Sequence, residues 1–239
     1  MSNFQLPNGS KLQLGNAFGT ERNFTAMTNA ADPVLTVASN TGATAIAAGD
    51  AVMITESTTS MLDKGVFYVK AADETSITLL GSNGRDFTIA DDYPPTTTGK
   101  LAKVSSWIDL PYVTDIANAG GDAQTTTINP VQLDKGIDIF TGTAASTTTL
   151  TFTHDSTDAV RAPLTAATRN QKPLAYRIIN PKASAGKGEH RVVGVKTSFN
   201  PVPTMSVGEV EVVTAAFTFL SDMNFYTTDK IPVPVEPVV

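Results

Sequence analysis

Residues able to do acid–base or metal chemistry are few in this chain and lie far apart. The two histidines, His154 and His190, both fall in predicted turns and have no partner at the spacing of metal ligands. Cysteine is absent, so neither a disulfide framework nor a thiolate metal site can form. We therefore expect no metal ion and no other cofactor.

Catalytic motifs give equally little support to an enzyme. A Ser-His-Asp triad needs no adjacency in sequence, but no serine here stands in a Gly-x-Ser-x-Gly elbow. Gly186-Lys187-Gly188 lacks the first glycine of a phosphate loop and the hydroxyl residue after the lysine, so a hairpin tip explains it better. Asp134 and Asp138 lie four residues apart and would share one face of a strand. Acids on the solvent-exposed face of a strand are ordinary and do not indicate a catalytic pair. The chain is predicted not to be an enzyme.

Apolar residues alternate with Thr, Ser and charged residues along two long stretches, Trp107–Phe152 and Leu174–Phe219. A period of two is the signature of strands with one face in water. Threonine is abundant and leucine is modest, which favours a sheet over a helix bundle. We predict a mainly β chain, in which the lone Trp107 is a core or interface anchor.

Short strands bounded by turn signals predict a small β-barrel domain inserted at residues 33–103, which ends in a Pro94-Pro95 linker. Its five expected strands are Val34–Val37, Ala51–Thr55, Val66–Lys70, Ser76–Leu80 and Asp86–Ile89. Residues 1–32 and 104–230 then make up the main domain.

Capping residues predict one short helix between Asp155 and Asn170. Either Ser156 or Asp158 could cap it, and Pro163 fits only in a first turn or at a kink. Three apolar residues would share its buried face: Val160, Leu164 and Ala167.

Two further segments of the chain are expected to lack regular structure. A loop of about 20 residues, 117–136, contains Gly120-Gly121 and Asn129-Pro130, and a loop this long is normally functional or disordered. Residues 231–239 are rich in proline and should form an extended C-terminal arm, free or laid along a neighbour.

Charge is unevenly distributed along the chain, whose formal net charge is −6. That balance disfavours a general affinity for nucleic acid or anionic lipid. Residues 159–200 nevertheless carry eight Lys and Arg side chains against Glu189 alone, which gives +8 − 1 = +7. This basic stretch is either a solvated face or a surface that meets an acidic surface on another copy of the chain.

The main domain resembles the major tail tube protein of long-tailed, non-contractile bacteriophages. The resemblance lies in the order and spacing of the elements over residues 104–220: Trp107-Ile-Asp-Leu-Pro-Tyr-Val-Thr-Asp-Ile, the Gly120-Gly121 loop, Asp138-Ile-Phe-Thr-Gly, Leu150-Thr-Phe-Thr, the helix, Leu174-Ala-Tyr-Arg-Ile-Ile, Gly194-Val-Lys-Thr-Ser-Phe and the closing Glu209–Phe219 strand. It implies a two-sheet sandwich or half-barrel with one short helix. The inserted domain departs from the minimal family pattern.

The resemblance also implies a function. Subunits of that family form hexameric rings that stack into a tube, around a lumen through which double-stranded DNA passes without specific binding. Expected partners are other copies of the chain, the tape measure protein, the tail tip and the tail terminator proteins. The chain would lie in the virion tail after assembly in the host cytoplasm. No apolar run reaches the roughly 20 residues needed to span a bilayer, so no membrane insertion is expected.

Three groups of residues are candidates for this role. The expected inter-ring loop contains Gly120, Gly121, Asp122, Asn129 and Asp134. The expected basic interface contains Lys182, Lys187 and Arg191, and the expected lumen-facing acids are Asp138, Glu209 and Glu211. An alternative function is a virion surface decoration protein or a carbohydrate-binding adhesin module.

Overall fold

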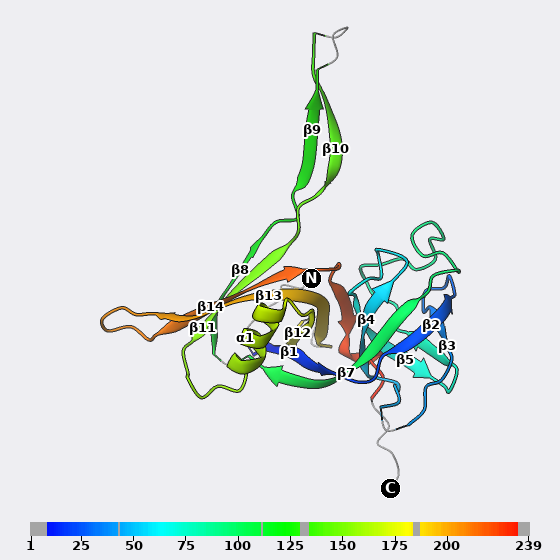
Figure 1. Cartoon of the computed structure of the whole chain (residues 1–239), viewed down its shortest axis with the longest axis horizontal. Coiled ribbons are helices and arrows are strands. Elements are labelled where there is room, and N and C mark those ends of the chain that lie inside the picture. Colours follow the sequence, from blue (N-terminus) through cyan, green and yellow to red (C-terminus); the bar gives the residue numbers. More distant parts are fainter. Residues whose placement is uncertain (1–8, 43, 111, 130–133, 184–186, 234–239) are drawn as a thin grey trace.

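Strands dominate the computed structural model, which describes residues 9–42, 44–110, 112–129, 134–183 and 187–233 (Figure 1). The described residues form fifteen strands and one α-helix. Along β11 (Thr147–Thr153) every second side chain is buried, as the alternation of threonine with Leu150 and Phe152 predicts. The prediction of a mainly β chain with one short helix, a small barrel and a second sheet is confirmed.

Six strands close into the barrel. They are β2 (Arg22–Met27), β3 (Val34–Val37), β4 (Ala51–Ser57), β5 (Val66–Ala72), β6 (Ser76–Leu79) and the first half of β7 (Gly99–Asp109). Neighbours follow the order β2-β3-β6-β5-β4-β7, and pairing of β7 with β2 closes the circle. Side chains such as Phe24, Phe67 and Leu101 fill its interior. Closure leaves the barrel without a free sheet edge.

Strand β7 continues out of the barrel into the second sheet. Its residues Gly99–Lys103 pair with β4, whereas Val104–Asp109 pair with β1 (Lys11–Phe18). The second sheet then runs β7-β1-β12-β13-β14-β11-β8, with β15 (Asn224–Thr227) also beside β13. Its remaining strands are β12 (Leu174–Asn180), β13 (Glu189–Thr204), β14 (Val212–Phe219) and β8 (Val113–Ala119).

Helix α1 (Arg161–Asn170) packs on β13 and closes the core of the second sheet. Val160, Leu164 and Ala167 are buried, as predicted, and Pro163 lies in the first turn, where its missing N–H removes no helical hydrogen bond. The predicted caps are wrong in detail, because Val160 occupies the N-cap position without a side-chain cap. Asp158 instead accepts a hydrogen bond from the backbone N–H of Val160, at 3.1 Å.

The barrel docks on the second sheet through a cluster of buried side chains, here called the docking cluster, which includes Val66, Tyr68, Val192 and Tyr226. The ring of Tyr68 meets that of Tyr226 edge-on at 5.2 Å between centroids. Polar groups bridge the same boundary, since the side-chain amide of Asn224 donates to the backbone oxygen of Val66 at 2.7 Å. The barrel and the second sheet therefore form one continuous packed body.

Three expectations about secondary structure are wrong. Residues 86–89 form turns, and Phe87 is buried in the barrel core without pairing to a strand. The segment 117–136 is not a structureless loop, because residues 117–119 belong to β8 and residues 123–128 form β9 (Ala123–Ile128), which pairs with β10 (Ile137–Thr143). The closing strand begins at Val212 and not at Glu209, since residues 205–211 form the turn before it.

The strand pairing also bears on the expected domain boundaries. Strand β2 lies in the segment 1–32 that was expected to join the main domain, yet it pairs with β3 and β7 and supplies Phe24 and Met27 to the barrel core. Residues 231–239 were expected to form an extended arm. Ile231 packs against the docking cluster, and residues 234–239 lie outside the described part of the chain.

Gly194 provides a test of the docking. A Cβ atom at Gly194 would lie 1.9 Å from the backbone oxygen of Lys64, whereas one at Gly19 would meet no atom closer than 3.7 Å. Gly194→Ala is expected to lower the free energy of unfolding by roughly 2–4 kcal/mol, because the barrel must move off the sheet. Gly19→Ala, the control, should change it by less than about 0.5 kcal/mol.

Denaturant unfolding followed by the fluorescence of Trp107, which packs against the docking cluster, measures both variants. Equal stability of Gly194→Ala and the parent chain would show that the barrel is not held against the sheet at this point.

Candidate functional site

Both histidines serve the fold in this structure. The hydroxyl of Tyr68 lies 2.8 Å from Nδ1 of His190 and accepts a hydrogen bond from Nη1 of Arg177 at 3.2 Å. Burial, together with the positive charge of Arg177, lowers the pKa of His190 to about 4. His154 instead lies 2.7 Å from the guanidinium of Arg161, and no group of metal-ligating side chains occurs among the described residues.

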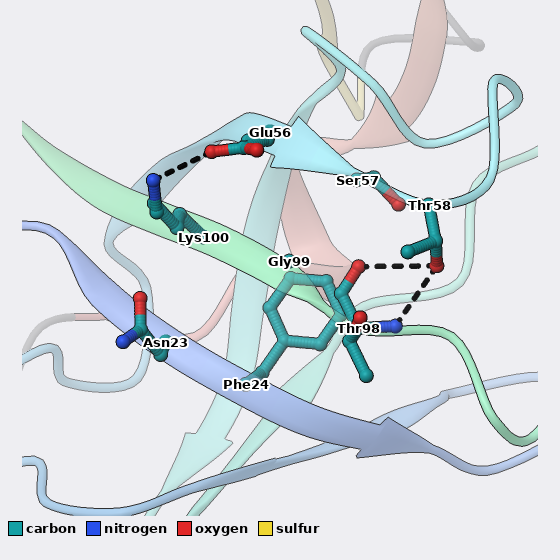
Figure 2. Close-up of a pocket in the computed structure, with 8 residues that line it drawn as sticks. All are labelled: Asn23, Phe24, Glu56, Ser57, Thr58, Thr98, Gly99 and Lys100. Atoms are coloured by element: carbon teal, nitrogen blue, oxygen red, sulfur yellow. Dashed lines mark hydrogen bonds and ion pairs between the residues drawn. The ribbon is translucent and has the colours of Figure 1, made fainter.

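A hollow lies at the rim of the barrel (Figure 2). It has a volume of about 350 Å³ and lies where β2, β4 and β7 meet. Lys100 and Glu56 neutralise each other across 2.6 Å, and the hydroxyl of Thr58 accepts from the backbone N–H of Thr98 at 3.1 Å (Figure 2). Because these polar groups already pair with one another, the hollow presents no strong charge to a ligand.

Strand β8 ends the second sheet with an unpaired edge. It pairs with β11 alone among the described strands, and every residue after Val113 is exposed. An exposed edge offers a row of unpaired backbone N–H and C=O groups to another chain. This edge is therefore a surface on which a further strand can add.

The β9–β10 hairpin, here called the arm, projects from the body and pairs with no other strand among the described residues (Figure 1). Ile128 lies opposite Ile137 in the ladder, and Ile139 shares their face because it is two residues further along β10. All three are exposed, as is Phe140 on the other face. An isolated two-stranded hairpin is marginal in water, so the arm needs a partner to cover it.

The five predicted inter-ring residues belong to this arm. Gly120, Gly121 and Asp122 form its neck, where the N–H of Gly121 donates to Ala144 O at 3.1 Å. Gly120 has φ +85° and its Cβ would meet Ala145 O at 2.1 Å, so glycine is required there. Asn129 follows β9 and Asp134 precedes β10, on either side of residues outside the described part of the chain.

A second hairpin, between β13 and β14, extends in another direction (Figure 1). Residues 200–211 at its end are almost all exposed, and they include Val202, Met205, Val207 and Val210. Sequence reasoning missed these apolar side chains, and it missed those of the arm. The alternation Ile137-Asp138-Ile139 could have indicated the arm strand.

The predicted basic interface is partly neutralised within the chain. Lys187 pairs with Asp229 at 3.1 Å, and Arg191 pairs with Glu189 at 2.5 Å while lying over the ring of Phe225. Lys182 is exposed in the turn after β12. Reversing Arg191 would therefore disturb the fold, because the new carboxylate would face that of the buried Glu189.

The three acids expected to face the lumen lie in two segments of the chain, β10 and the turn before β14. Asp138 is on β10 and accepts a hydrogen bond from the hydroxyl of Thr127 at 2.5 Å. Glu209 lies in the turn at the end of the β13–β14 hairpin. Glu211 is the last residue of the same turn, and its carboxylate is 4.0 Å from Nε2 of His154. The arm that carries Asp138 and the hairpin whose turn carries Glu209 and Glu211 extend in different directions (Figure 1).

A long apolar helix of the kind that crosses a membrane is not found in the described part of the chain. The unpaired β8 edge and the two exposed hairpins are surfaces suited to protein contacts.

Comparison with known proteins indicates the family to which the chain belongs. No curated protein sequence matches the chain. A similar solved structure is the SPP1 tail tube, determined by solid-state NMR and cryo-electron microscopy: it is 13% identical, with 54% of this chain and 76% of that chain covered and a TM-score of 0.39. The family model described as phage tail tube protein, TTP, matches residues 57–228, more than half of the chain. The chain therefore belongs to the phage tail tube protein family.

Proposed function

We propose that this chain polymerises through contacts with its own copies into stacked, hexameric rings, which form the phage tail tube around a lumen for the genome. The observation that carries the proposal is the coexistence of an unpaired sheet edge with two exposed apolar hairpins on a chain of this family. Each of these features is a liability in a monomer and is removed when another copy covers it.

Ring closure is the first step of the proposed assembly. Each copy would use its β8 edge to continue the sheet into a different surface of the next copy, which is a heterologous contact. Such a contact closes into a ring when a whole number of identical rotations between neighbouring copies adds up to a full turn. Backbone pairing at β8 also explains why its side chains need not be apolar, since ladder hydrogen bonds supply the contact.

Stacking is the second step, and the arm is suited to it. It extends beyond the body by the full length of β9 and β10, so it can reach a copy in the next ring (Figure 1). The exposed face of Ile128, Ile137 and Ile139 supplies apolar area that is removed from contact with water only when a partner covers it. The neck residues Gly120 and Gly121 would set the direction in which the arm leaves the sheet.

The remaining partners follow from the place of a tube in the tail. The tape measure protein would occupy the lumen before DNA does, and the tail tip and tail terminator proteins would meet the two ends. DNA would pass without specific binding. Assembly would take place in the host cytoplasm before the tail joins the virion.

Purified protein is expected to form hollow tubes of stacked rings when it is concentrated or given tail-tip initiators. Sedimentation and negative-stain electron microscopy measure this directly. A stable monomer or dimer under every condition would contradict the proposal, and a regular array on the outside of another virion structure would favour the decoration protein.

A matched pair of substitutions tests the arm. Ile139 in the arm and Ile89 in a turn of the barrel are each 45% exposed. Ile139→Ser should raise the protein concentration needed for tubes about 10- to 100-fold, because covering an isoleucine contributes roughly 1.5–3 kcal/mol. Ile89→Ser should leave that concentration unchanged.

Thermal unfolding of the unassembled subunit provides the control for folding, since both side chains already face water. An equal effect of the two substitutions, or no effect of Ile139→Ser, would remove the arm from the proposed contact.

A further inference from the structure

A groove of about 810 Å³ lies beside β8, the last strand in the order of the second sheet. Strands β1 and β12, from the other half of that order, also line it, so the sheet curves far enough to bring both halves to one hollow. Five strands contribute apolar side chains to its walls. The apolar lining residues are Leu12, Val113, Ile116, Ile178, Phe219, Met223 and Phe225.

The apolar lining continues the core of the second sheet. Val113, Ile178, Phe219 and Met223 pack against the core cluster that α1 closes, yet each of them is only half-buried by the described residues. Ile116, on the β8 side of the groove, is 40% exposed. Covering such side chains is favourable because it removes apolar area from water. The groove is therefore a place where the core can gain a further apolar segment.

Polar side chains at the groove largely pair within the fold. The hydroxyl of Thr148 donates to Oδ1 of Asn118 at 2.6 Å, and Arg191 pairs with Glu189 at 2.5 Å. These contacts leave little charge to attract an ionic ligand. An uncharged segment with apolar side chains fits the groove better.

The chain itself enters the fold at this groove. Gly9 and Ser10, which immediately precede β1, are among its lining residues. Gly9 has φ +88°, a left-handed conformation that glycine adopts without strain, so the backbone turns at this point. Residues 1–8 lie outside the described part of the chain and are joined to it at the wall of the groove.

The length of this N-terminal segment is sufficient to cross the groove. A fully extended chain spans about 3.3–3.6 Å per residue, so eight residues reach roughly 26–29 Å. The part of β8 that lines the groove, residues 113–118, spans only about 17 Å.

The composition of the N-terminal segment matches the groove. Residues 1–8 contain no charged side chain. Phe4 and Leu6 are two residues apart, so in an extended conformation they share one side, with Gln5 on the other. Pro7 favours an extended conformation for the residue before it.

We propose that residues 1–8 lie as an extended segment in the groove of their own copy, with Phe4 and Leu6 against its apolar lining. A segment joined at the wall of its site has an effective concentration on the order of millimolar, which favours it over the same segment of a second copy. Its contacts tie β8 to β1 through side chains, and the backbone groups along the β8 edge stay free for another copy. This interaction belongs to the single subunit and goes beyond the proposed assembly.

The absence of cysteine from the sequence allows a direct test, because a double cysteine variant can form only one disulfide within a chain. Leu6→Cys is combined with Ile116→Cys in the groove, or with Met223→Cys as a second groove position. The control combines Leu6→Cys with Ser39→Cys, an exposed barrel position outside the groove lining. Dilute, unassembled subunits are oxidised with oxidised glutathione, and the products are followed by mass spectrometry and non-reducing electrophoresis.

We expect the disulfide within one chain to form at least about 10-fold faster in the two groove variants than in the control, because the segment holds the thiols together. Formation no faster than in the control would overturn the proposal. Disulfide-linked dimers as the main product would also overturn it, since the occupant would then be a second copy.

Substitutions within the segment give an independent measurement that needs no cysteine. Phe4→Ser should lower the urea midpoint of unfolding of the unassembled subunit by roughly 0.5–1 M, because a covered aromatic ring is lost. Gln5→Ser, on the other side of the segment, should leave the midpoint unchanged. Equal midpoints for the two variants would contradict the docking. Both measurements use unassembled subunits, so a failure to form tubes would contradict the proposed function and leave this inference standing.

Discussion

Strand β7 carries the backbone hydrogen bonds of two sheets at once, and the arrangement of the whole chain depends on that continuity. Its first half closes the barrel against β2 and β4, and its second half pairs with β1. The barrel therefore cannot swing freely, and Gly194 allows the backbone of Lys64 to approach the sheet. Docking in turn buries Tyr68 and Tyr226 and leaves His190 in a site where its neutral form is favoured.

This packing decides which surfaces remain for other molecules. The barrel covers one part of the second sheet, and α1 covers the core side of the strands around β13. What stays open is the β8 edge, the arm and the end of the β13–β14 hairpin. Two edges or patches of this kind on one chain generate a polymer when they are complementary, which agrees with membership of a family of tail tube proteins.

Periodicity predicted much of the fold, and it failed where a strand depends on a distant partner. Turn signals around short apolar runs identified β4 and β5, alternation identified β11, and the apolar spacing identified the buried face of α1. Residues 86–89 alternate equally well, yet no ladder partner lies beside them, so they remain turns. The Gly120-Gly121 pair indicated a flexible loop, whereas in the fold it forms the neck of a hairpin. The partners of Lys187 and Arg191 could not be predicted, because the ion pair to Asp229 joins segments that only the fold brings together.

Hydrogen exchange of the β8 backbone amides tests the central claim most directly, because that claim is that copies of the chain complete each other's sheets. In dissociated subunits the β8 amides that do not pair with β11 should exchange rapidly, and in tubes they should be protected by roughly 100-fold or more, as paired strands are. The amides of β11, which lie between β8 and β14, should be protected in both states. Equal, rapid exchange of β8 in subunits and in assembled tubes would contradict the account.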